Sequence, residues 1–372
     1  MGDLSRSSCD FVSLASAGVR GLHPYQPGKP TEELERELGI TNIVKLASNE
    51  NPLGASPKAL AAIESELNSL TRYPDGNGFT LKSALCAKLS VEADQITLGN
   101  GSNDVLDLIA RSFAEPGREV IFSQYAFAVY PLATQSVNAT AVVTPAKDWG
   151  HDLDAMLDAI TEHTAIIFIA NPNNPTGTSL SKQQIVQFLN AVPERVVVVL
   201  DEAYIEYNLG GSFPNGLELL AEYPNLIVTR TFSKAWGLAA LRVGYSVSSS
   251  EIADVLNRVR QPFNVNSIAM AGACGALQDD AYLSKSIAVN SEGMQQLTSA
   301  FERLGYDYIP SYGNFVCFDT RRTGVEVYQE MLQQGVIVRP VSNYGMENHL
   351  RVSVGLREEN QRFIEVLESL SA

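Results

Sequence analysis

Cysteine is scarce in this chain, with four residues among 372. They are scattered at Cys9, Cys86, Cys274 and Cys317, and no pair has the spacing of a metal site or of a redox motif. We therefore interpret them as buried or incidental thiols in a reducing compartment, and we expect no metal site and no disulfide framework.

Basic residues and long apolar runs are also in short supply. There are 27 Lys and Arg residues against 42 Asp and Glu, which gives a formal net charge of −15. Nucleic-acid binding needs clustered Lys and Arg, and no such cluster is present. No apolar run approaches the length that crosses a bilayer, and the first residues do not have the pattern of a signal peptide. The sequence predicts a cytoplasmic protein that binds neither nucleic acid nor membrane.

The middle of the chain alternates short apolar runs with helical patterns. Several runs are apolar at successive positions, as in strands that are buried on both faces of a mainly parallel sheet. The predicted strands are residues 95–99, 119–123, 139–145, 165–170, 195–200 and 226–230. Helical spacing occurs at 102–113 and 181–192, the second with Ser181 as N-cap. This order predicts an α/β fold whose large domain has three layers, α/β/α.

The pattern changes beyond about residue 262. Helical segments at 262–280, 290–305 and 358–370, with short strands at 306–310, 314–319, 335–341 and 349–355, predict a smaller α+β domain. The first 45 residues include the proline-rich stretch HPYQPGKP and predict an extended arm that packs on this smaller domain. We thus expect an arm at 1–45, a large domain at 46–262 and a small domain at 263–372.

Polar, turn-forming stretches directly follow four of the predicted strands. Open α/β sheets bind ligands at the carboxyl ends of their strands, so we expect these stretches to share one site. They are NGSND at 100–104, NPNNPTG at 171–177, DEAY at 201–204 and TFSK at 231–234.

The first two stretches each allow two interpretations. NGSND leads backbone N–H groups and a helix N-terminus to one point, which suits a phosphate, although a helix cap without ligand would use the same residues. NPNNPTG contains two X-Pro bonds that fix an irregular loop able to aim a carboxamide at a ligand. Asn173 and Asn174 could equally be turn residues.

The other two stretches each carry one charged side chain in apolar surroundings. Asp201 ends an apolar strand, where a carboxylate is costly unless it faces a cation or caps the next turn. Lys234 lies between Ser233 and Ala235, next to Trp236 and Gly237. A poorly hydrated lysine is a usable nucleophile toward an aldehyde, whereas the competing interpretation is a lysine whose stem is buried and whose amine reaches water.

Together these stretches hold an anion site, a carboxamide, a buried carboxylate, a tyrosine and an amine nucleophile with an arginine eight residues further on. Pyridoxal phosphate requires these groups, because a lysine bonds to its aldehyde, an acid keeps its ring nitrogen protonated and its phosphate needs a clamp. The sequence therefore predicts a site for this cofactor.

At this point the chain resembles the pyridoxal-phosphate-dependent aminotransferases of the aspartate aminotransferase fold and, within them, the histidinol-phosphate aminotransferases. The resemblance covers nearly the whole chain and implies the pyridoxal-phosphate-dependent transferase fold. It rests on the strings HPYQPGKP, KLASNENPLG, RYPDGNG, GNGSND, NPNNPTG, DEAYIEY, RTFSKAWGLAALRVGY, RQPFNVN, GNFVCF, GVIVRPV and HLRVSVG.

The resemblance implies a role for each cofactor-binding residue. Lys234 would bond to the cofactor and move a proton at the substrate Cα, and Asp201 would pair with the ring nitrogen. Asn174 and Tyr204 would hydrogen-bond the phenolic oxygen of the cofactor. The residues that would surround its phosphate are Ser102, Asn103, Ser233 and Arg242, together with Tyr73 from a neighbouring subunit, which makes a homodimer necessary.

The resemblance also implies the substrate contacts. Arg351 would bind the α-carboxylate of glutamate, and Arg339 with Tyr25 would receive the phosphate of the second substrate. For Arg339 a plain surface charge remains the alternative. The two arginines would create a local positive pocket in an acidic protein.

The chain departs from the pattern of many relatives at two positions. Asn103 replaces an acid in GNGSND, which leaves the backbone donors in place. The segment QYAFAVY offers Phe127 where many relatives have a tyrosine that stacks on the cofactor ring, and Tyr125 remains an alternative.

These expectations predict an enzyme that transfers an amino group between glutamate and imidazole-acetol phosphate by a ping-pong mechanism, a step of histidine biosynthesis. An aromatic amino acid aminotransferase and an amino-acid-phosphate decarboxylase of the same fold are the alternatives. A further alternative, the effector-binding module of a transcription regulator, would need an added DNA-binding domain and a basic face, and the sequence has neither.

Overall fold

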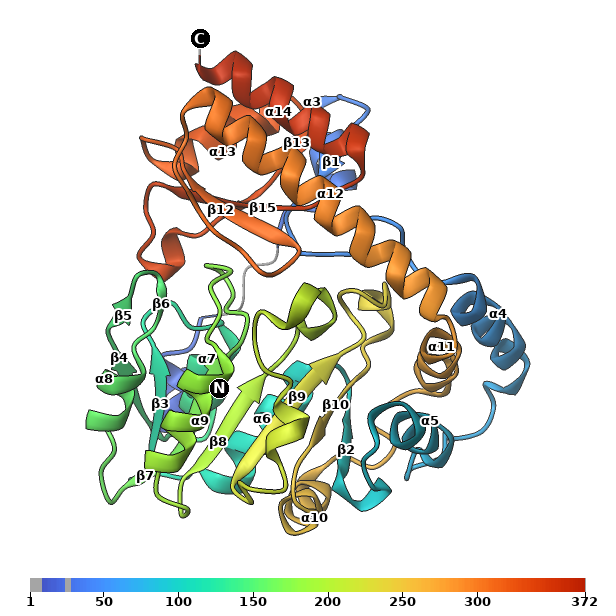
Figure 1. The fold of residues 1–372 in the computed structure, drawn as a ribbon, viewed down its shortest axis with the longest axis vertical. Helices are drawn as coiled ribbons and strands as arrows, with labels where there is room; N and C mark the ends of the chain where they lie inside the picture. Colours follow the sequence, from blue (N-terminus) through green and yellow to red (C-terminus); the bar gives the residue numbers. More distant parts are fainter. Residues whose placement is uncertain (1–8, 24–27, 372) are drawn as a thin grey trace, which may run out of the picture.

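The computed structural model describes residues 9–23 and 28–371 of the chain. A seven-stranded sheet with helices on both faces forms the larger part, and a smaller part with a four-stranded sheet lies above it in Figure 1. The long helix α12 (Asp280–Leu304) runs from beside the large sheet into the smaller part. The predicted α/β fold with an added α+β part is confirmed.

The large sheet has the strand order β2-β10-β9-β8-β7-β3-β4. All neighbouring pairs are parallel except those that involve β10, which runs antiparallel to β2 and β9. The strands are β2 (Ile96–Gly99), β3 (Glu119–Ser123), β4 (Thr140–Thr144), β7 (Thr164–Ala170), β8 (Val197–Asp201), β9 (Leu226–Thr231) and β10 (Gly244–Val247). The six strands predicted for this region are confirmed, whereas β10 was not predicted.

Helices cover both faces of the large sheet. The core on one face includes side chains of α6 (Ser102–Phe113), α7 (Val129–Ser136) and α10 (Ser250–Val259), and that on the other includes side chains of α8 (Leu153–Asp158) and α9 (Lys182–Ala191). The predicted helices at 102–113 and 181–192 are confirmed. Ser181 caps α9 as expected, because its Oγ accepts from the Gln184 backbone N–H at 3.3 Å.

A third group of helices lies beside β2, on the right in Figure 1. It consists of α4 (Pro57–Glu66), α5 (Phe79–Leu89) and α11 (Ser267–Leu277). Helices α4 and α11 pack closely, since a Cβ on Gly275 would lie 2.5 Å from the Lys58 carbonyl oxygen. The remaining short helices are η1 (Leu67–Ser69), η2 (Ala93–Gln95), η3 (Ile205–Tyr207), η4 (Leu209–Gly211), η5 (Gly216–Leu219), η6 (Ala239–Leu241) and η7 (Ser342–Tyr344).

The smaller part has the strand order β11-β12-β15-β14. Its strands are β11 (Tyr308–Ile309), β12 (Phe315–Asp319), β14 (Arg339–Pro340) and β15 (His349–Ser353), and α12, α13 (Gly324–Gln333) and α14 (Arg357–Ser371) pack on it. The strand predicted at 335–341 is split, because β13 (Val336–Ile337) pairs with β1 (Val44–Lys45) and β14 pairs with β15. Helix α13 was not predicted.

The described residues of the expected extended arm contain three helices, so that expectation is wrong in part. They are α1 (Phe11–Leu14), α2 (Ala17–Arg20) and α3 (Thr31–Leu38), and α3 ends at Gly39 in a left-handed conformation. Leu34 of α3 packs against Ile337 of the smaller part. Gly18 of α2 instead lies against α7 of the larger part, where its Cβ would meet the Gln135 carbonyl oxygen.

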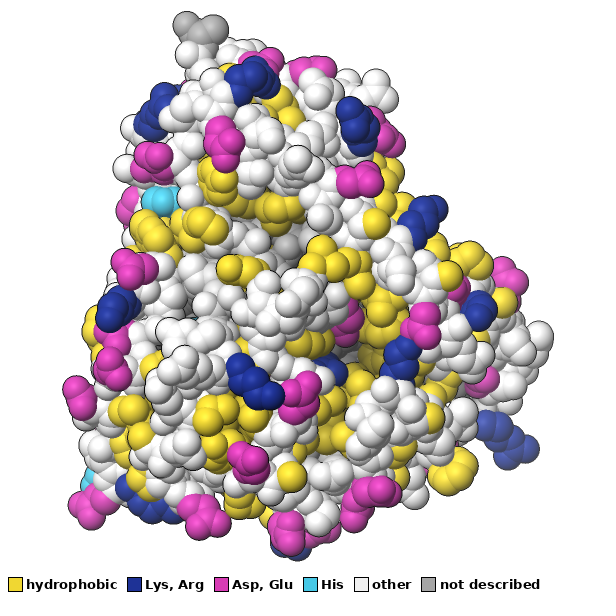
Figure 2. All heavy atoms as spheres, viewed as in Figure 1, with side chains coloured by type: hydrophobic (Ala, Val, Ile, Leu, Met, Phe, Trp, Pro, Cys, Tyr) yellow, Lys and Arg dark blue, Asp and Glu magenta, His cyan; other side chains and the backbone are white. Residues whose placement is uncertain are grey.

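The surface carries interspersed charges. On the face shown in Figure 2, acidic and basic side chains alternate and no single basic stripe runs across it. In the described part of the chain, no helix is both long enough and apolar enough to cross a membrane.

Candidate active site

A cavity of about 460 Å³ lies where the carboxyl ends of the large-sheet strands face the smaller part. It brings together residues that are far apart in the sequence and were predicted to form one site. Those that line it are Ser102, Asn103, Phe127, Asn174, Asp201, Tyr204, Ser233, Lys234, Arg242, Arg339 and Arg351. Tyr73 does not line it, and Tyr25 lies outside the described residues.

Lys234 lies three residues beyond the end of β9, in the loop before η6. Its Nζ donates to the Ser48 carbonyl oxygen at 3.2 Å. The pKa of Lys234 is lowered from its ordinary value of 10.5 to about 8. Burial is the larger cause, and the nearby positive charge of Arg351 is the second. A fraction of the amine is therefore neutral, and so nucleophilic, near neutral pH.

The loop around Lys234 depends on close backbone packing. Gly237 has a φ of +71°, and a Cβ at this position would lie 2.0 Å from the Gly54 carbonyl oxygen. Only glycine fits such a contact, so this residue fixes how the Lys234 loop meets the chain before α4.

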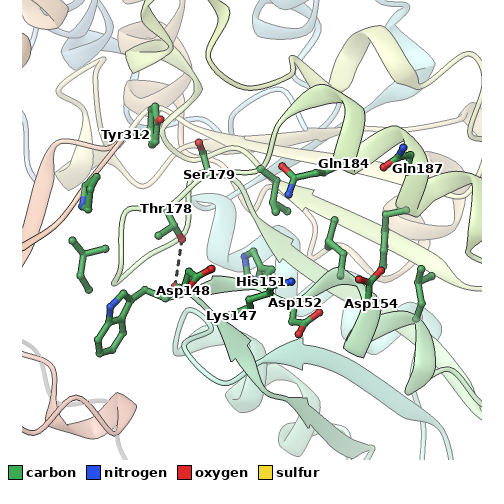
Figure 3. Close-up of a pocket in the computed structure, with 18 residues that line it drawn as sticks. Lys147, Asp148, His151, Asp152, Asp154, Thr178, Ser179, Gln184, Gln187 and Tyr312 are labelled. Atoms are coloured by element: carbon green, nitrogen blue, oxygen red, sulfur yellow. Dashed lines mark hydrogen bonds between the residues drawn. The ribbon is translucent and has the colours of Figure 1, made fainter.

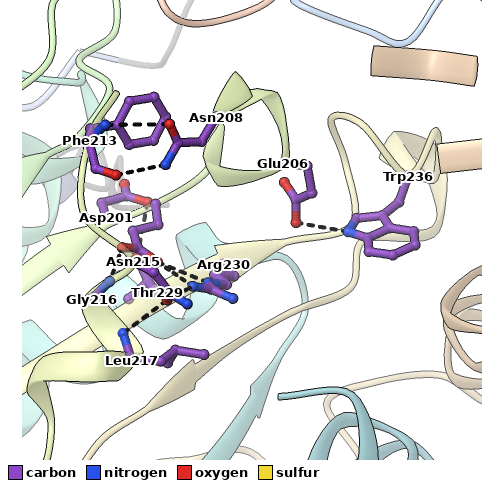
Figure 4. Close-up of polar contacts among 11 residues, drawn as sticks. Asp201, Glu206, Asn208, Phe213, Asn215, Gly216, Leu217, Thr229, Arg230 and Trp236 are labelled. Atoms are coloured by element: carbon purple, nitrogen blue, oxygen red, sulfur yellow. Dashed lines mark hydrogen bonds and ion pairs between the residues drawn. The ribbon is translucent and has the colours of Figure 1, made fainter. Parts of the chain in front are cut away.

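Asp201 ends β8, and each of its two carboxylate oxygens accepts a hydrogen bond from a side chain. Oδ2 accepts from the Tyr130 hydroxyl at 2.8 Å and Oδ1 accepts from the Thr229 hydroxyl at 3.0 Å, the contact drawn in Figure 4. Burial raises the pKa of Asp201, and these hydrogen bonds, with one from the Ala203 backbone, oppose that rise. Asp201 lines the cavity and also accepts a hydrogen bond from the following turn, as the capping interpretation predicts, whereas its pairing with a cation stays a prediction.

Tyr204 lies beside the lysine, and Asn174 contacts Arg351. The Tyr204 hydroxyl accepts from Asn49 Nδ2 at 2.9 Å, and Lys234 Nζ is 5.8 Å from the Tyr204 ring centre. Burial raises the pKa of Tyr204 to about 12, so its hydroxyl keeps its proton and can donate. Asn174 Oδ1 accepts from Arg351 Nη1 at 2.5 Å.

The end of the cavity near α6 is built for an anion. Gly101 precedes the helix with a φ of +86°, and α6 has no side-chain cap, so its first N–H groups are left for a ligand. A Cβ on Gly101 would lie 2.4 Å from Arg242 Nη2, so glycine leaves room for the guanidinium. Arg242 Nη1 donates to Ser233 Oγ at 3.3 Å, which places these two donors together.

Two arginines reach the cavity from the smaller part. Arg339 on β14 and Arg351 on β15 are paired in register on neighbouring strands. Arg351 Nη2 donates to the Ala47 carbonyl oxygen at 2.8 Å, whereas its buried Nε has no hydrogen-bond partner among the described residues. A buried donor of this kind is costly unless an acceptor binds beside it.

Phe127, not Tyr125, lies at this cavity. The Phe127 ring contacts the Tyr130 ring edge to face, with centres 5.9 Å apart. Tyr125 packs on Trp149 instead, with ring centres 5.3 Å apart. An aromatic face is therefore available to a ring in the cavity, but without a hydroxyl group.

Residues 41–367 match the family model described as aminotransferase class I and II. The chain belongs to this aminotransferase family. It is 61% identical to histidinol-phosphate aminotransferase 2 of Pseudomonas fluorescens strain Pf0-1, over 98% of this chain and 99% of that protein. It is 60% identical to histidinol-phosphate aminotransferase 2 of Pseudomonas aeruginosa, over 98% of this chain and 99% of that protein.

Solved structures of aminotransferases have the same fold. The histidinol-phosphate aminotransferase of Sinorhizobium meliloti in complex with pyridoxal-5'-phosphate has a TM-score of 0.88 at 28% identity, and covers 96% of this chain and 98% of its own. An aspartate aminotransferase variant of Thermus thermophilus has a TM-score of 0.83 at 22% identity, with 96% and 98% covered. The second likeness concerns the fold alone.

Four residues that hydrogen-bond the reacting groups of the aminotransferase were missed in the sequence, and two of them, Ser48 and Asn49, line the cavity. The four are Ser48, which accepts from Lys234, Asn49, which donates to Tyr204, and the two hydroxyl donors to Asp201, Tyr130 and Thr229. The polar run SNEN after β1 could have indicated the first two. Nothing in the local pattern marks Tyr130 or Thr229, because only the fold places them beside Asp201.

A second cavity in the aminotransferase, of about 650 Å³, lies apart from these residues. It is bordered by the hairpin of β5 (Ala146–Lys147) and β6 (Gly150–His151), by α9 and by Tyr312, as Figure 3 shows. Burial lowers the pKa of its His151 to about 4, and His151 Nε2 donates to the Ala170 carbonyl oxygen. Lys234 and Asp201 do not line this cavity, so the first cavity is the candidate active site.

Proposed function

We propose that this aminotransferase transfers the amino group of glutamate to imidazole-acetol phosphate, and so forms histidinol phosphate and 2-oxoglutarate, with pyridoxal phosphate as cofactor. The observation that carries the proposal is that Arg339 and Arg351, on neighbouring strands, reach the cavity that also holds Lys234. Two cationic groups match a substrate pair with a carboxylate and a phosphate. The 61% identity to a curated histidinol-phosphate aminotransferase supports the same substrate.

The residues of the cavity fit the cofactor. Lys234 would bond to its aldehyde, Asp201 would pair with its ring nitrogen and Phe127 would stack on its ring. Asn174 and Tyr204 would bind its phenolic oxygen. Its phosphate would be held by Ser102, Asn103, Ser233 and Arg242, where the uncapped α6 N-terminus and the guanidinium converge.

The cofactor, when bound, supplies an electron sink for the bond that breaks at the substrate Cα. The Lys234 amine, with its pKa near 8, removes the proton from Cα and returns one in the second half-reaction. The hydrogen bonds that Tyr130 and Thr229 donate to Asp201 favour its charged form, which would pair with the protonated ring nitrogen. Arg351 orients the carboxylate of glutamate, and the keto acid leaves before the second substrate enters the same cavity.

A substitution at Arg339 tests the proposed substrate. The Arg339→Gln variant should raise KM for histidinol phosphate about 30-fold, while the half-reaction with glutamate changes by less than about twofold. The Arg258→Gln variant is the matched control, because Arg258 is exposed and pairs only with Asp254 on the surface of α10. Equal losses with both substrates would contradict a phosphate-binding role for Arg339.

A comparison of kcat/KM decides between the leading function and an aromatic aminotransferase. With 2-oxoglutarate as acceptor, histidinol phosphate should be preferred over phenylalanine by at least about 100-fold, since phenylalanine cannot use the phosphate site. A preference for phenylalanine would refute the proposal. Release of carbon dioxide without amino transfer would instead indicate the decarboxylase.

We also propose a homodimer in which Tyr73 completes the partner's phosphate site. Tyr73 is 83% exposed, which is unusual for so large an aromatic side chain. Its ring stacks on Phe263, with ring centres 4.7 Å apart. Other large apolar side chains nearby in the sequence are exposed as well, namely Leu60, Leu67, Leu70 and Phe79. A second copy on this face would cover them.

Mixing two inactive variants tests this sharing. Lys234→Ala lacks the amine, and Tyr73→Ala lacks the residue lent to the partner, but a mixed dimer holds one complete site. After subunit exchange we expect about a quarter of wild-type activity from random pairing. No recovery, with mixed dimers verified by mass, would contradict the shared site.

A cytoplasmic location completes the proposal. All four cysteines are free in the structure, in keeping with a reducing compartment. Fractionation of cells that express the tagged chain should place it with cytoplasmic markers.

A further inference from the structure

One hydrogen bond joins the two segments that carry Tyr204 and Lys234. Glu206 lies in η3, two residues after Tyr204, and Trp236 lies two residues after Lys234. Trp236 Nε1 donates to Glu206 Oε1 at 2.9 Å, as Figure 4 shows. The contact therefore ties the turn after β8 to the loop after β9.

Two further contacts hold the Lys234 loop. Asn51 Nδ2 donates to the Ala235 carbonyl oxygen at 2.8 Å and to Ser286 Oγ of α12 at 2.9 Å. Gly237 packs against the Gly54 backbone. Of the three contacts, at residues 235, 236 and 237, the one through Trp236 alone has an ionisable partner.

The Glu206 carboxyl has surroundings that the proposed reaction does not explain. Its Oε2 is buried and has no hydrogen-bond partner among the described residues. Burial raises the pKa of Glu206 from its ordinary 4.5 to about 7, although Arg230 on β9 favours the charged form. The negative charge of Glu202, which directly follows β8, disfavours the charged form of Glu206.

The neighbouring charges are themselves paired. Arg230 Nη2 donates to Glu202 Oε2 at 2.7 Å and to Asn215 Oδ1 at 2.6 Å. Tyr207 on the same turn and Tyr245 on β10 also face the Glu206 carboxyl, and burial of each hydroxyl raises its pKa, so both stay neutral. Among the described residues Glu206 forms no direct ion pair, and the charges of Arg230 and Glu202 act on it through space.

We propose that Glu206 is a positioning residue that holds the Lys234 loop in register with Tyr204 through the indole of Trp236. The inference rests on the proposed role of Lys234 as the reacting amine. A carboxylate acceptor makes a stronger hydrogen bond than a neutral one. Displacement of the loop by even about 1 Å would lower the rate by up to about 100-fold, because the reacting atoms must be aligned.

The indole signal of Trp236 reports directly on this contact. In the cofactor-free protein the nitrogen-15 indole signals can be assigned with Trp149→Phe, since the chain has two tryptophans. We expect the Trp236 signal to move with a single midpoint near pH 7. The movement should be absent in Glu206→Gln. A signal that does not respond to pH in the wild-type protein would overturn the coupling.

Kinetics separate positioning from mere stability. Glu206→Ala should lower kcat about tenfold with KM changed by less than about twofold, and it should speed amide exchange at residues 233–238 about tenfold. Glu206→Gln keeps an acceptor and should stay within about threefold of the wild-type kcat. Glu222→Ala, which removes an exposed carboxylate, is the matched control and should change neither quantity.

Three kinetic results would each overturn the proposal. The first is a wild-type kcat and wild-type amide exchange in Glu206→Ala. The others are a kcat of Glu206→Gln no higher than that of Glu206→Ala, and a wild-type kcat in Trp236→Phe. The last variant removes the donor together with part of the ring, and it serves if Glu206→Ala does not fold, because a wild-type kcat would still show that the contact is not needed. Exchange in the cofactor-free protein does not depend on turnover. A chain without aminotransferase activity would therefore refute the proposed function and still leave the exchange result to decide the role of Glu206.

Discussion

At the scale of single residues, burial decides which groups in and behind the cavity can exchange protons near neutral pH. It lowers the pKa of Lys234 to about 8 and raises that of Glu206 to about 7, so both come close to the physiological range from opposite sides. It raises the pKa of Tyr204 to about 12, so this hydroxyl remains a donor. The same physical cause thus gives an amine base and a neutral phenol side by side.

Burial of Lys234 also has a cost in stability. Below about pH 8 the folded state must keep a buried ammonium, whereas between pH 8 and 10.5 the unfolded chain holds the proton and the folded chain has lost it. Stability of the cofactor-free protein should therefore rise with pH in this window. Lys234→Met should stabilise the protein by about 2 kcal/mol at pH 7, and less at pH 10.

Urea unfolding at the two pH values measures this difference. Lys285→Met is the control, because Lys285 is exposed on α12 and its replacement should leave stability within about 0.5 kcal/mol at both. Equal effects of the two substitutions would mean that the Lys234 ammonium is not penalised in the folded state.

Tyr130 should matter through Asp201. Tyr130→Phe keeps the ring stacked on Phe168 and removes the hydroxyl that donates to Asp201 at 2.8 Å. The pKa of Asp201 should rise, and a carboxyl that is less ionised should bind pyridoxal phosphate about tenfold more weakly. Absorbance titration of the cofactor-free protein gives this affinity.

Tyr223→Phe provides the matched comparison. Its hydroxyl donates to Asn190 at 2.9 Å, away from the cavity. An unchanged cofactor affinity is expected for this variant. If Tyr130→Phe also leaves the affinity unchanged, Tyr130 does not support Asp201.

At the scale of elements, parallel strands deliver polar residues to one edge of the large sheet. Asp201 is the last residue of β8, Asn174 lies in the loop after β7 and Lys234 lies in the loop after β9. These residues come close together because the three strands are neighbours and run in the same direction. The antiparallel β10 then leads the chain away from Arg242, which itself has a positive φ of 57°. Element order therefore places most of the residues that we propose to contact the cofactor.

A close backbone contact constrains the shape of the Lys234 loop. Gly237 and Gly210 have nearly the same φ, +71° and +73°, but a Cβ on Gly210 would meet nothing within 4 Å. Gly210→Ala should cost about 1 kcal/mol from backbone strain alone. Gly237→Ala should cost about 3 kcal/mol or more, because the Gly54 backbone must also move.

Chemical denaturation compares the two glycine variants, and cofactor binding gives a second measurement. Gly237→Ala should also impair cofactor binding, whereas Gly210→Ala should bind as the wild-type chain does. Similar stabilities for both would show that the loop can relax without cost.

At the scale of the whole molecule, the cavity exists because two bodies meet. The larger part supplies Lys234 and Asp201, and the smaller part supplies Arg339 and Arg351. Helix α12 bridges the two parts, and β1, which pairs with β13, attaches the N-terminal segment to the smaller part. The distance between lysine and arginines is thus set by packing between the parts.

Leu34 of α3 should anchor the N-terminal segment. It is fully buried against Leu332 and Ile337, so Leu34→Ala should cost about 2 to 5 kcal/mol and speed hydrogen exchange in β13. Leu209→Ala is the control, since Leu209 is exposed in η4 and should cost less than about 0.5 kcal/mol. Retained stability in Leu34→Ala would mean that α3 does not contribute to the folded core.

The sequence by itself determined six of the seven strands of the large sheet, helices α6 and α9 and half of the residues that line the cavity. Apolar runs and turn residues are local signals, and buried parallel strands leave them plainly. The short β10, the split of residues 335–341 into β13 and β14 and the helices of the N-terminal segment were not determined in this way. Their pairing partners lie far along the chain or their patterns are too short.

Only the tertiary structure decided which partners support the reacting groups. It placed Tyr130 and Thr229 on Asp201, and Trp236 on Glu206, across separations that no local pattern records. The shifted pKa values have the same origin, because desolvation depends on everything that packs around a group. The sequence indicates which residues take part in the chemistry, whereas tertiary packing sets their protonation states and their relative positions.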